Sequence, residues 1–141
     1  MFDRILLAFK FTAAGRLALD KAVQLAKEHG SELRIFHALD YRLKELDRSD
    51  PKLTEIIAQT EDRFESELKP LLNGFDNAQF GCSPADPAME VCKIARYVNA
   101  DLIIVGSHQL PEKTCLARVD YVGMTILEKA PCPVMLVPHC K

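Results

Sequence analysis

The chain has 141 residues, the usual size of one domain, and this length can bury a sizeable core without disulfides. Apolar residues make up 48% and charged residues 27%, a balance that excludes a disordered chain, a collagen and a bundle of membrane helices. Eighteen Lys and Arg against twenty Asp and Glu leave a formal charge of −2, so the general electrostatic attraction to nucleic acid or anionic lipid is missing. We expect one domain over residues 1–141, with no nucleic-acid and no membrane partner.

The first residues and the cysteines indicate a cytoplasmic protein. The apolar run from Ile5 to Phe9 is too short for the core of a signal peptide, and it lacks a small-residue cleavage site. No uncharged stretch approaches the ~20 residues that a membrane-spanning helix requires. The five cysteines are widely spaced and contain no Cys-x-x-Cys pair, which is typical of reduced, packed thiols. They are Cys82, Cys92, Cys115, Cys132 and Cys140.

The first forty residues predict a strand, a helix and a second strand. Residues 4–9 are an almost continuous apolar run, as expected for a strand that is covered on both faces. Residues 13–29 mix apolar and charged positions and stop at Gly30, which supplies the left-handed turn that ends a helix. Residues 33–39 are β-like and end at Asp40. Together they form a strand-helix-strand unit with a right-handed crossover.

Two Asp-Pro pairs mark the next two helix starts, because Asp is a good N-cap and Pro is favoured at the first helical position. In the longer of these helices, apolar residues as far as Leu71 recur at three- and four-residue steps. The segments are a mobile, charge-rich connection over 40–50, a long amphipathic helix over 51–73, a weak strand over 76–82 and a third helix over 87–99.

The last third of the chain predicts two more strands and a fourth helix. Residues 101–105 form the clearest buried strand, and Gly106-Ser107 follows as a sharp break from strand to loop. A helix over about 114–129 and a strand over 133–138 complete the chain. Strands that alternate with helices require a mostly parallel sheet with helices on both faces. We therefore predict a doubly wound α/β domain of five strands and four helices with strand order 3-2-1-4-5, in which the first and fourth strands are interior.

Ligands of such sheets bind outside the carboxyl ends of the strands, where the winding direction reverses. In this chain that point lies between the first and fourth strands. The candidate crevice residues lie at or just beyond the strand ends: Ala8, Lys10, Phe11, Ala38, Val105, Gly106, Ser107, His108 and Gln109.

The sequence contains no recognisable catalytic set. His108 lies in the loop at this point, but no Ser or Cys nucleophile has an elbow motif and no acidic residue is paired with it. His37, on an apolar strand, is interpreted as a hydrogen-bonded core histidine. Cys132, His139 and Cys140 suggest either a soft-metal site or a frayed tail, and we favour the tail. We therefore predict no catalytic residue and no metal.

Several segments together resemble the universal stress protein family. They are Arg4-Ile-Leu-Leu-Ala8, His37-Ala-Leu-Asp40, Pro87-Ala88, the run from Ala100 to Ser107, and the run from Ala130 to Pro138. The likeness covers essentially the whole chain, and only residues 40–85 are generic. It implies a cytoplasmic stress-response protein, commonly a homodimer, which in some members holds ATP in the crevice between the first and fourth strands.

The nucleotide-binding branch of that family has an Asp two residues after the Ala that ends the first strand. After the fourth strand it has Gly-x-x-Gly, nine residues, and Gly-Ser/Thr. Here Lys10 replaces the Asp, Gly106 keeps the first glycine, Gln109 replaces the second, and Asp120-Tyr121 stands where the final pair falls. Lys cannot accept hydrogen bonds, and phosphate loops need bare backbone N–H groups. The resemblance therefore favours the branch that does not bind nucleotides.

Two functions follow from the sequence. The favoured one is a non-enzymatic stress-response homodimer that contacts unidentified protein partners, with ATP binding lost and no cofactor. The alternative is a family member that binds a nucleotide or small anion, with Lys10 as a phosphate contact. The charged segment from Arg42 to Asp50 is either a partner-binding loop or a solvated connection.

The last strand is expected to form the dimer contact. An apolar edge strand invites pairing, and the resemblance implies antiparallel contact with the same strand of a second subunit. The dimer edge is Val134, Met135, Leu136 and Val137.

Overall fold

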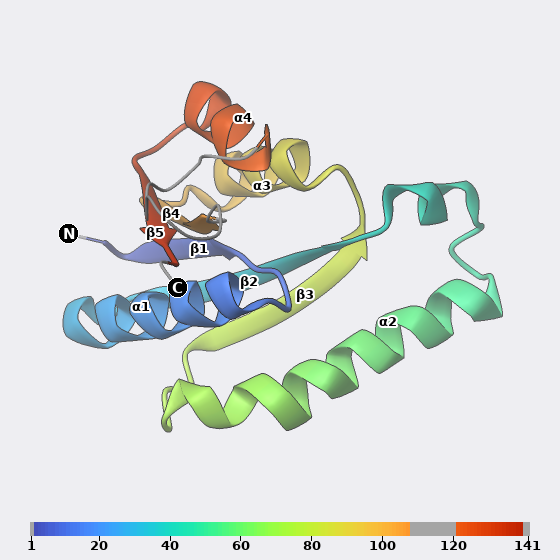
Figure 1. The fold of residues 1–141 in the computed structure, drawn as a ribbon, viewed down its shortest axis with the longest axis horizontal. Coiled ribbons are helices and arrows are strands. Elements are labelled where there is room, and N and C mark those ends of the chain that lie inside the picture. Colours follow the sequence, from blue (N-terminus) through green and yellow to red (C-terminus); the bar gives the residue numbers. More distant parts are fainter. Residues whose placement is uncertain (1, 108–120, 140–141) are drawn as a thin grey trace, which may run out of the picture.

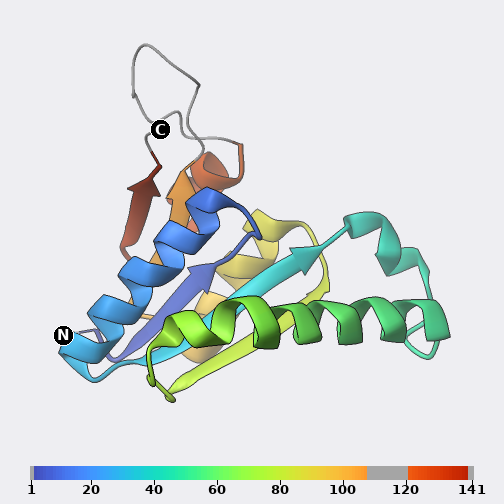
Figure 2. The same cartoon turned by 60° about the horizontal axis from the view of Figure 1, so that its bottom comes forward.

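The computed structural model describes residues 2–107 and 121–139 as a parallel five-stranded sheet between two layers of helices (Figure 1). In chain order the elements are β1 (Arg4–Ala8), α1 (Ala13–His29), β2 (Glu32–Leu39), α2 (Pro51–Arg63), β3 (Ala78–Pro84), α3 (Pro87–Val98), β4 (Leu102–Ser107), α4 (Tyr121–Lys129) and β5 (Val134–Pro138). Helices α1 and α2 lie on one face and α3 and α4 on the other, as the turned view also shows (Figure 2). The strand order β3-β2-β1-β4-β5 confirms the predicted topology and fold class.

Strands β1 and β4 are interior, as predicted, and they divide the apolar residues between two cores. β1 pairs with β2 along its whole length and with β4 from Ile5 to Ala8. Ile5 and Leu7 join the core under α1 and α2, whereas Leu6 joins the core under α3 and α4. Burial on both faces explains the near-continuous apolar run. These two strands place the residues that follow them side by side at one edge of the sheet.

The helices begin at the capping residues that the sequence indicates. Asp86 accepts a hydrogen bond from the Met89 N–H at 3.2 Å, and Asp50 caps α2 in the same way. Thr12 caps α1 by accepting from the Gly15 N–H at 3.0 Å. Within the described residues, no helix combines the length and apolar composition that crossing a bilayer requires.

Helix α2 differs from the prediction in its last turns. It continues as a π-helical turn over Phe64–Leu68 and a 3₁₀ turn over Lys69–Leu72. A 3₁₀ turn advances by about 120° per residue, which is more than an α-helix does, so the apolar stripe rotates relative to its predicted path. As a result Leu72 is buried, whereas Leu71, expected on the apolar stripe, is 41% exposed.

Two connections also differ from the prediction. The charge-rich connection over 40–50 contains a 3₁₀ helix, Tyr41–Glu45, whose N-cap is Asp40. Gly106 and Ser107 were expected to form a break after the fourth strand, but they belong to β4 and pair with the end of β5. Glycine is found within a strand where another part of the backbone approaches closely. At Gly106 the approaching backbone is that of Ala14.

Candidate functional site

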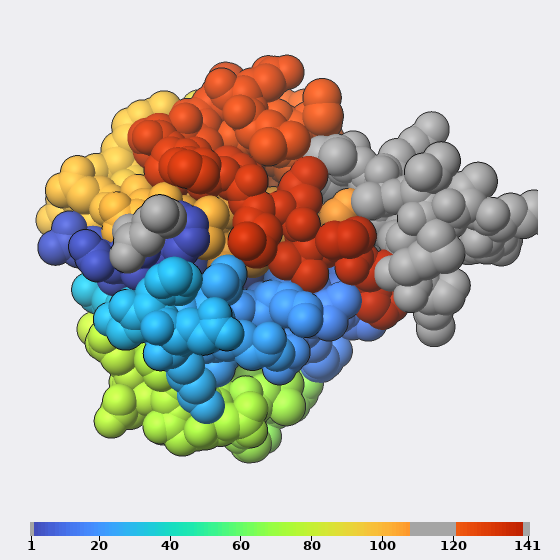
Figure 3. Space-filling view, turned by 90° about the vertical axis from the view of Figure 1, so that its left-hand side faces the viewer, coloured from blue at the N-terminus to red at the C-terminus, as the bar shows by residue number. Residues whose placement is uncertain are grey.

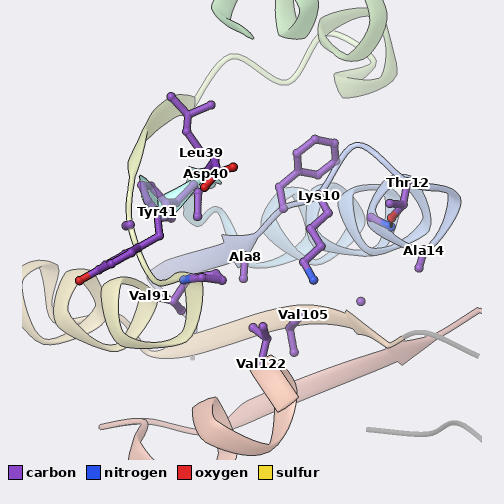
Figure 4. Close-up of a pocket in the computed structure, with 17 residues that line it drawn as sticks. Ala8, Lys10, Thr12, Ala14, Leu39, Asp40, Tyr41, Val91, Val105 and Val122 are labelled. Carbon is purple, nitrogen blue, oxygen red and sulfur yellow. Dashed lines mark hydrogen bonds between the residues drawn. The ribbon is translucent and has the colours of Figure 1, made fainter. Parts of the chain in front are cut away.

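A cavity of about 270 Å³ opens at the carboxyl ends of β1, β2 and β4, where the sequence predicts the crevice (Figure 4). Its walls are mainly apolar, and they come from the strand ends, from the first turn of α1, from the 3₁₀ helix Tyr41–Glu45, and from α3 and α4. The described lining residues are Ala8, Phe9, Lys10, Thr12, Ala14, Gly15, Phe36, Ala38, Leu39, Asp40, Tyr41, Ala85, Pro87, Val91, Val105, Gly106 and Val122.

The structure brings together about half of the predicted crevice residues. Those that line the cavity are Ala8, Lys10, Ala38, Val105 and Gly106. Phe11, Ser107 and Tyr121 are not among the lining residues: Phe11 packs beside His37, Ser107 is buried in β4, and Tyr121 is 76% exposed at the start of α4. The remaining three, His108, Gln109 and Asp120, lie outside the described residues.

Lys10 is the charged side chain that projects into this cavity. It extends from the end of β1, and its amine ends near Ala8 and Val105 (Figure 4). Among the described lining residues it supplies the one cation, and Asp40 supplies the one carboxylate. An ammonium group donates hydrogen bonds and accepts none. The crevice therefore presents a positively charged donor at position 10. The sequence resemblance implies an Asp, and thus an acceptor, at this position in nucleotide-binding members.

Two glycines allow the first turn of α1 to approach the strand ends. A Cβ atom at Gly15 would lie 1.8 Å from the Lys10 carbonyl oxygen, and one at Gly106 would lie 2.8 Å from the Ala14 carbonyl oxygen. Both distances are shorter than van der Waals contact, and in both cases the neighbour is backbone. The packing of α1 against β1 and β4 therefore requires glycine at both positions.

Asp40 and Tyr41 form a polar rim. The Asp40 carboxylate accepts hydrogen bonds from the Arg42 guanidinium, with Nη2 at 2.6 Å, and from the Arg42 backbone N–H at 2.9 Å. The guanidinium lowers the pKa of Asp40 to about 2. The carboxylate is therefore ionised at neutral pH and is engaged by Arg42. Tyr41 lines the same side of the cavity and is largely exposed.

His37 is a packed, hydrogen-bonded histidine, as predicted. Its Nδ1–H donates to the Phe9 carbonyl oxygen at 2.9 Å, and its ring meets the Phe11 ring edge-on. The Arg63 guanidinium, at the end of α2, lies 4.3 Å from the centre of the Phe11 ring. Burial lowers the pKa of His37, and the positive charges of Arg63 and Lys10 lower it further. The ring is therefore neutral at pH 7 and has a structural role.

The described cysteines are free thiols that show no activation. Burial raises the pKa of Cys92, of Cys132 and, to about 11, of Cys82. A thiol with a raised pKa is a poor nucleophile at neutral pH. Cys115 and Cys140 lie outside the described residues, and so does any metal site that would depend on Cys140. Over 2–107 and 121–139, no group of three metal-ligating side chains comes together.

The sequence did not identify the wall that α3 and α4 contribute. This wall consists of Pro87 and Val91 of α3 and Val122 of α4, together with Ala85 in the connection before α3. The Asp86-Pro87 pair was a usable signal, because it places the first turn of a helix beside the strand ends. The wall residues are small or apolar, however, and in a sequence they look the same as residues of the core.

Comparisons with known proteins agree with the fold. The model of the universal stress protein family matches residues 1–138, whereas a search of curated proteins found no match. The universal stress protein UspA from Lactobacillus plantarum is similar with a TM-score of 0.75 at 20% identity, over 96% of this chain and 97% of that one. A universal stress protein in complex with cAMP has a TM-score of 0.64 at 17% identity, over 99% of this chain and 98% of that one. One from Archaeoglobus fulgidus, in complex with dAMP, has a TM-score of 0.64 at 16% identity, over 97% and 98%. These likenesses show the fold, and the family match over nearly the whole length shows that this chain belongs to the universal stress protein family.

Proposed function

We propose that this protein is a cytoplasmic, non-catalytic stress-response protein that acts as a homodimer and does not use ATP. The observation that carries the proposal is Lys10, whose amine projects into the crevice in place of a carboxylate. A carboxylate can accept hydrogen bonds from an adenine amino group or a ribose hydroxyl, and an ammonium group cannot. The free, unactivated thiols of the described part are consistent with a reducing compartment.

Within the described residues, the crevice lining also offers no pair of groups for catalysis. The Thr12 hydroxyl lines it but accepts a hydrogen bond as the N-cap of α1, and Asp40 is engaged by Arg42. His37 is absent from the lining and neutral. In the described part of the cavity, no nucleophile therefore has a base beside it, which nucleophilic catalysis would require.

Calorimetry with ATP tests the loss of nucleotide binding. We expect no saturable binding by the wild type up to about 1 mM ATP, with or without magnesium. Lys10→Asp restores an acceptor and Lys10→Met only removes the charge, so the Asp variant is expected to bind ATP at least about tenfold more tightly than the Met variant. Micromolar ATP binding by the wild type would contradict the proposal.

The proposed dimer uses the outer edge of β5, which pairs with no other strand among the described residues. This strand ends the sheet, and Figure 3 shows its red surface between α4 and α1. The Pro133 carbonyl accepts from the Ile103 N–H at 3.0 Å, and backbone groups alternate in direction along a strand. The N–H groups of Val134 and Leu136 therefore point toward the outer edge, where a second copy of β5 can accept their hydrogen bonds.

Light scattering tests this edge. At micromolar concentration we expect about twice the chain mass of 15.8 kDa. A lysine on an edge strand opposes pairing, so Leu136→Lys is expected to give the monomer mass. Gln79→Lys adds the same charge to β3 at the other edge of the sheet and should leave the dimer intact. A wild type that stays monomeric, or a dimer that is lost equally in both variants, would contradict the proposed interface.

A second candidate function is the binding of a small anion in the crevice. It is favoured by the cavity of about 270 Å³, which has apolar walls and the Lys10 ammonium group. That volume lies just below the ~300–1,000 Å³ of typical ligand pockets, so it suits a ligand smaller than a nucleoside triphosphate. Two family members of the same fold were solved with cAMP and dAMP, each of which carries one phosphate.

Thermal unfolding with AMP, and with adenosine as its uncharged counterpart, tests this candidate. If the phosphate meets Lys10, AMP at a hundred times its Kd should stabilise the protein by about 2.7 kcal/mol. Adenosine at the same concentration should stabilise it less, and Lys10→Met should remove the difference between the two compounds. An equal response to both compounds in the wild type would exclude Lys10 as the anion contact.

A further inference from the structure

A second cavity, of about 650 Å³, lies on the other side of the sheet from α2. It is bounded by α3 and by the faces of β2 and β3 that point toward α3. The register pairs Phe36 with Gly81, and Phe36 belongs to the core under α3. Phe80 points the opposite way and stacks on Phe64, which follows the last residue of α2. The sheet is therefore covered by α2 on one face of β3 and left hollow on the other.

The part of the floor formed by Phe36 and Gly81 is apolar and open. Phe36 lines it, and a Cβ atom at Gly81 would meet no atom within 4 Å. Gly81 does not have a positive φ, so its backbone conformation does not require glycine. A glycine within a strand often marks a place where a ligand approaches the backbone. The missing side chain at position 81 keeps part of the cavity empty.

One wall carries an aromatic ring and a positive charge. Glu90, Lys93 and Tyr97 lie on α3 at three- and four-residue steps, which places them on one face of the helix. Tyr97 is 87% exposed, although a ring of this size normally buries most of its surface. An exposed aromatic ring beside a hollow apolar floor can stack on a flat ligand.

The charges of the lining favour an anion. Three cations, Arg34, Lys93 and Arg96, line the cavity together with one carboxylate, Glu90. Arg96 is held in place because its Nη2 donates to the Lys129 carbonyl oxygen at 2.8 Å. The ion pairs formed between residues of the described ranges involve neither Arg34 nor Lys93. An excess of positive charge in the lining attracts an anionic group, and hydrogen bonds between charged groups are stronger than neutral ones.

We propose that this cavity binds a small molecule with a flat apolar ring and one carboxylate or phosphate group. The ring lies over Phe36 and Gly81 against Tyr97, and the anionic group meets Arg34 and Lys93. The volume is within the ~300–1,000 Å³ of ligand pockets. The site is separate from the crevice that contains Lys10, and Phe36 is the one described residue that lines both cavities.

Backbone amide NMR with three naphthalene compounds tests this site. 1-Naphthyl phosphate carries a phosphate group and 1-naphthoate carries a carboxylate on the same naphthalene ring system. 1-Naphthol has that ring system and is uncharged at neutral pH. At least one anion is expected to bind about tenfold more tightly than naphthol, with the largest shifts at Gly81 and Tyr97. The tighter anion identifies the anionic group. Shifts confined to Ala8 and Gly106, or equal affinity for all three compounds, would overturn the proposal.

Variants separate this site from general attraction to a cation. Arg34→Met and Lys93→Met are each expected to weaken binding of the preferred anion by about tenfold. Lys21→Met removes an exposed lysine from α1, on the opposite face of the sheet, and should leave the affinity unchanged. Equal affinity in all three variants, or equal weakening in all three, would show that the cations of the cavity do not hold the ligand.

Gly81→Phe fills the cavity from its floor. A side chain at this position meets open space, so the variant should fold with an unchanged or higher melting temperature and lose the binding. If it fails to fold, the Arg34 and Lys93 variants decide the proposal. A folded Gly81→Phe protein that binds the anion as the wild type does would overturn it. So would shifts at Gly81 that depend on protein concentration without added compound, because a second copy of the chain would then occupy the cavity.

Discussion

Replacing Gly15 by alanine is expected to destabilise the protein by about 3 kcal/mol, because the new methyl group overpacks a contact between two backbone segments. The Cβ atom would lie 1.8 Å from the Lys10 carbonyl oxygen. The residue therefore fits only if the first turn of α1 moves away from the end of β1. In an ordinary helix interior the same substitution stabilises by about 0.5–1 kcal/mol, so the sign of the effect identifies the close approach.

Urea denaturation of Gly15→Ala measures this effect as a lower midpoint at an unchanged slope. Gly81→Ala is the matched control, because its Cβ atom meets open space in a strand. Alanine there should stabilise by about 0.5 kcal/mol, since glycine in a strand interior is unfavourable. A Gly15→Ala protein as stable as the wild type would mean that α1 does not begin this close to Lys10.

The topology could be predicted because each element carries a local signal that agrees with its place in the sheet. The interior strands β1 and β4 are apolar on both faces, and they read as continuous runs for that reason. The caps at Asp50 and Asp86 are made by side chains, and so they are visible as residue types. Gly30 ends α1 with a φ of 64°, which glycine adopts without cost.

The crevice could be predicted in position but only partly in composition. Strand ends such as Ala8 and Val105 follow from the winding rule, and both line the cavity. Val91 and Val122 come from helices whose distance from the crevice depends on tertiary packing, which no local pattern encodes. Leu72 is buried in place of Leu71 for a similar reason, since a change of helix type rotates every later side chain about the helix axis.

The second cavity was not predictable from the sequence, because it depends on what is missing between elements. Arg34 and Gln79 are ordinary polar positions on two strands, and Tyr97 is an ordinary position on a helix. Only the register of β2 with β3 and the placement of α3 bring them around one space. Gly81 carried a weak signal, since a glycine inside a strand needs an explanation.

Replacing Gly106 by valine is expected to destabilise the protein by about 3 kcal/mol, even though valine favours strands. The first carbon of the side chain would lie 2.8 Å from the Ala14 carbonyl oxygen and 3.1 Å from the Ala14 carbonyl carbon. Gly106 stands at the first glycine of the signature that binds phosphate in the nucleotide-binding branch. The contact with α1 supplies a reason for glycine at this position that involves no phosphate.

The comparison of Gly106→Val with Lys10→Met separates packing from ligand contact. Gly106→Val should lower the urea midpoint whether or not a ligand is present, whereas Lys10→Met should change the response to AMP with little change in the midpoint. A stable Gly106→Val protein that has lost a wild-type response to AMP would contradict the packing explanation and would assign Gly106 to the ligand. Because Gly15 and Gly106 both hold the first turn of α1 against the strand ends, the two glycine variants should lower stability through the same contact region, and their effects should not add.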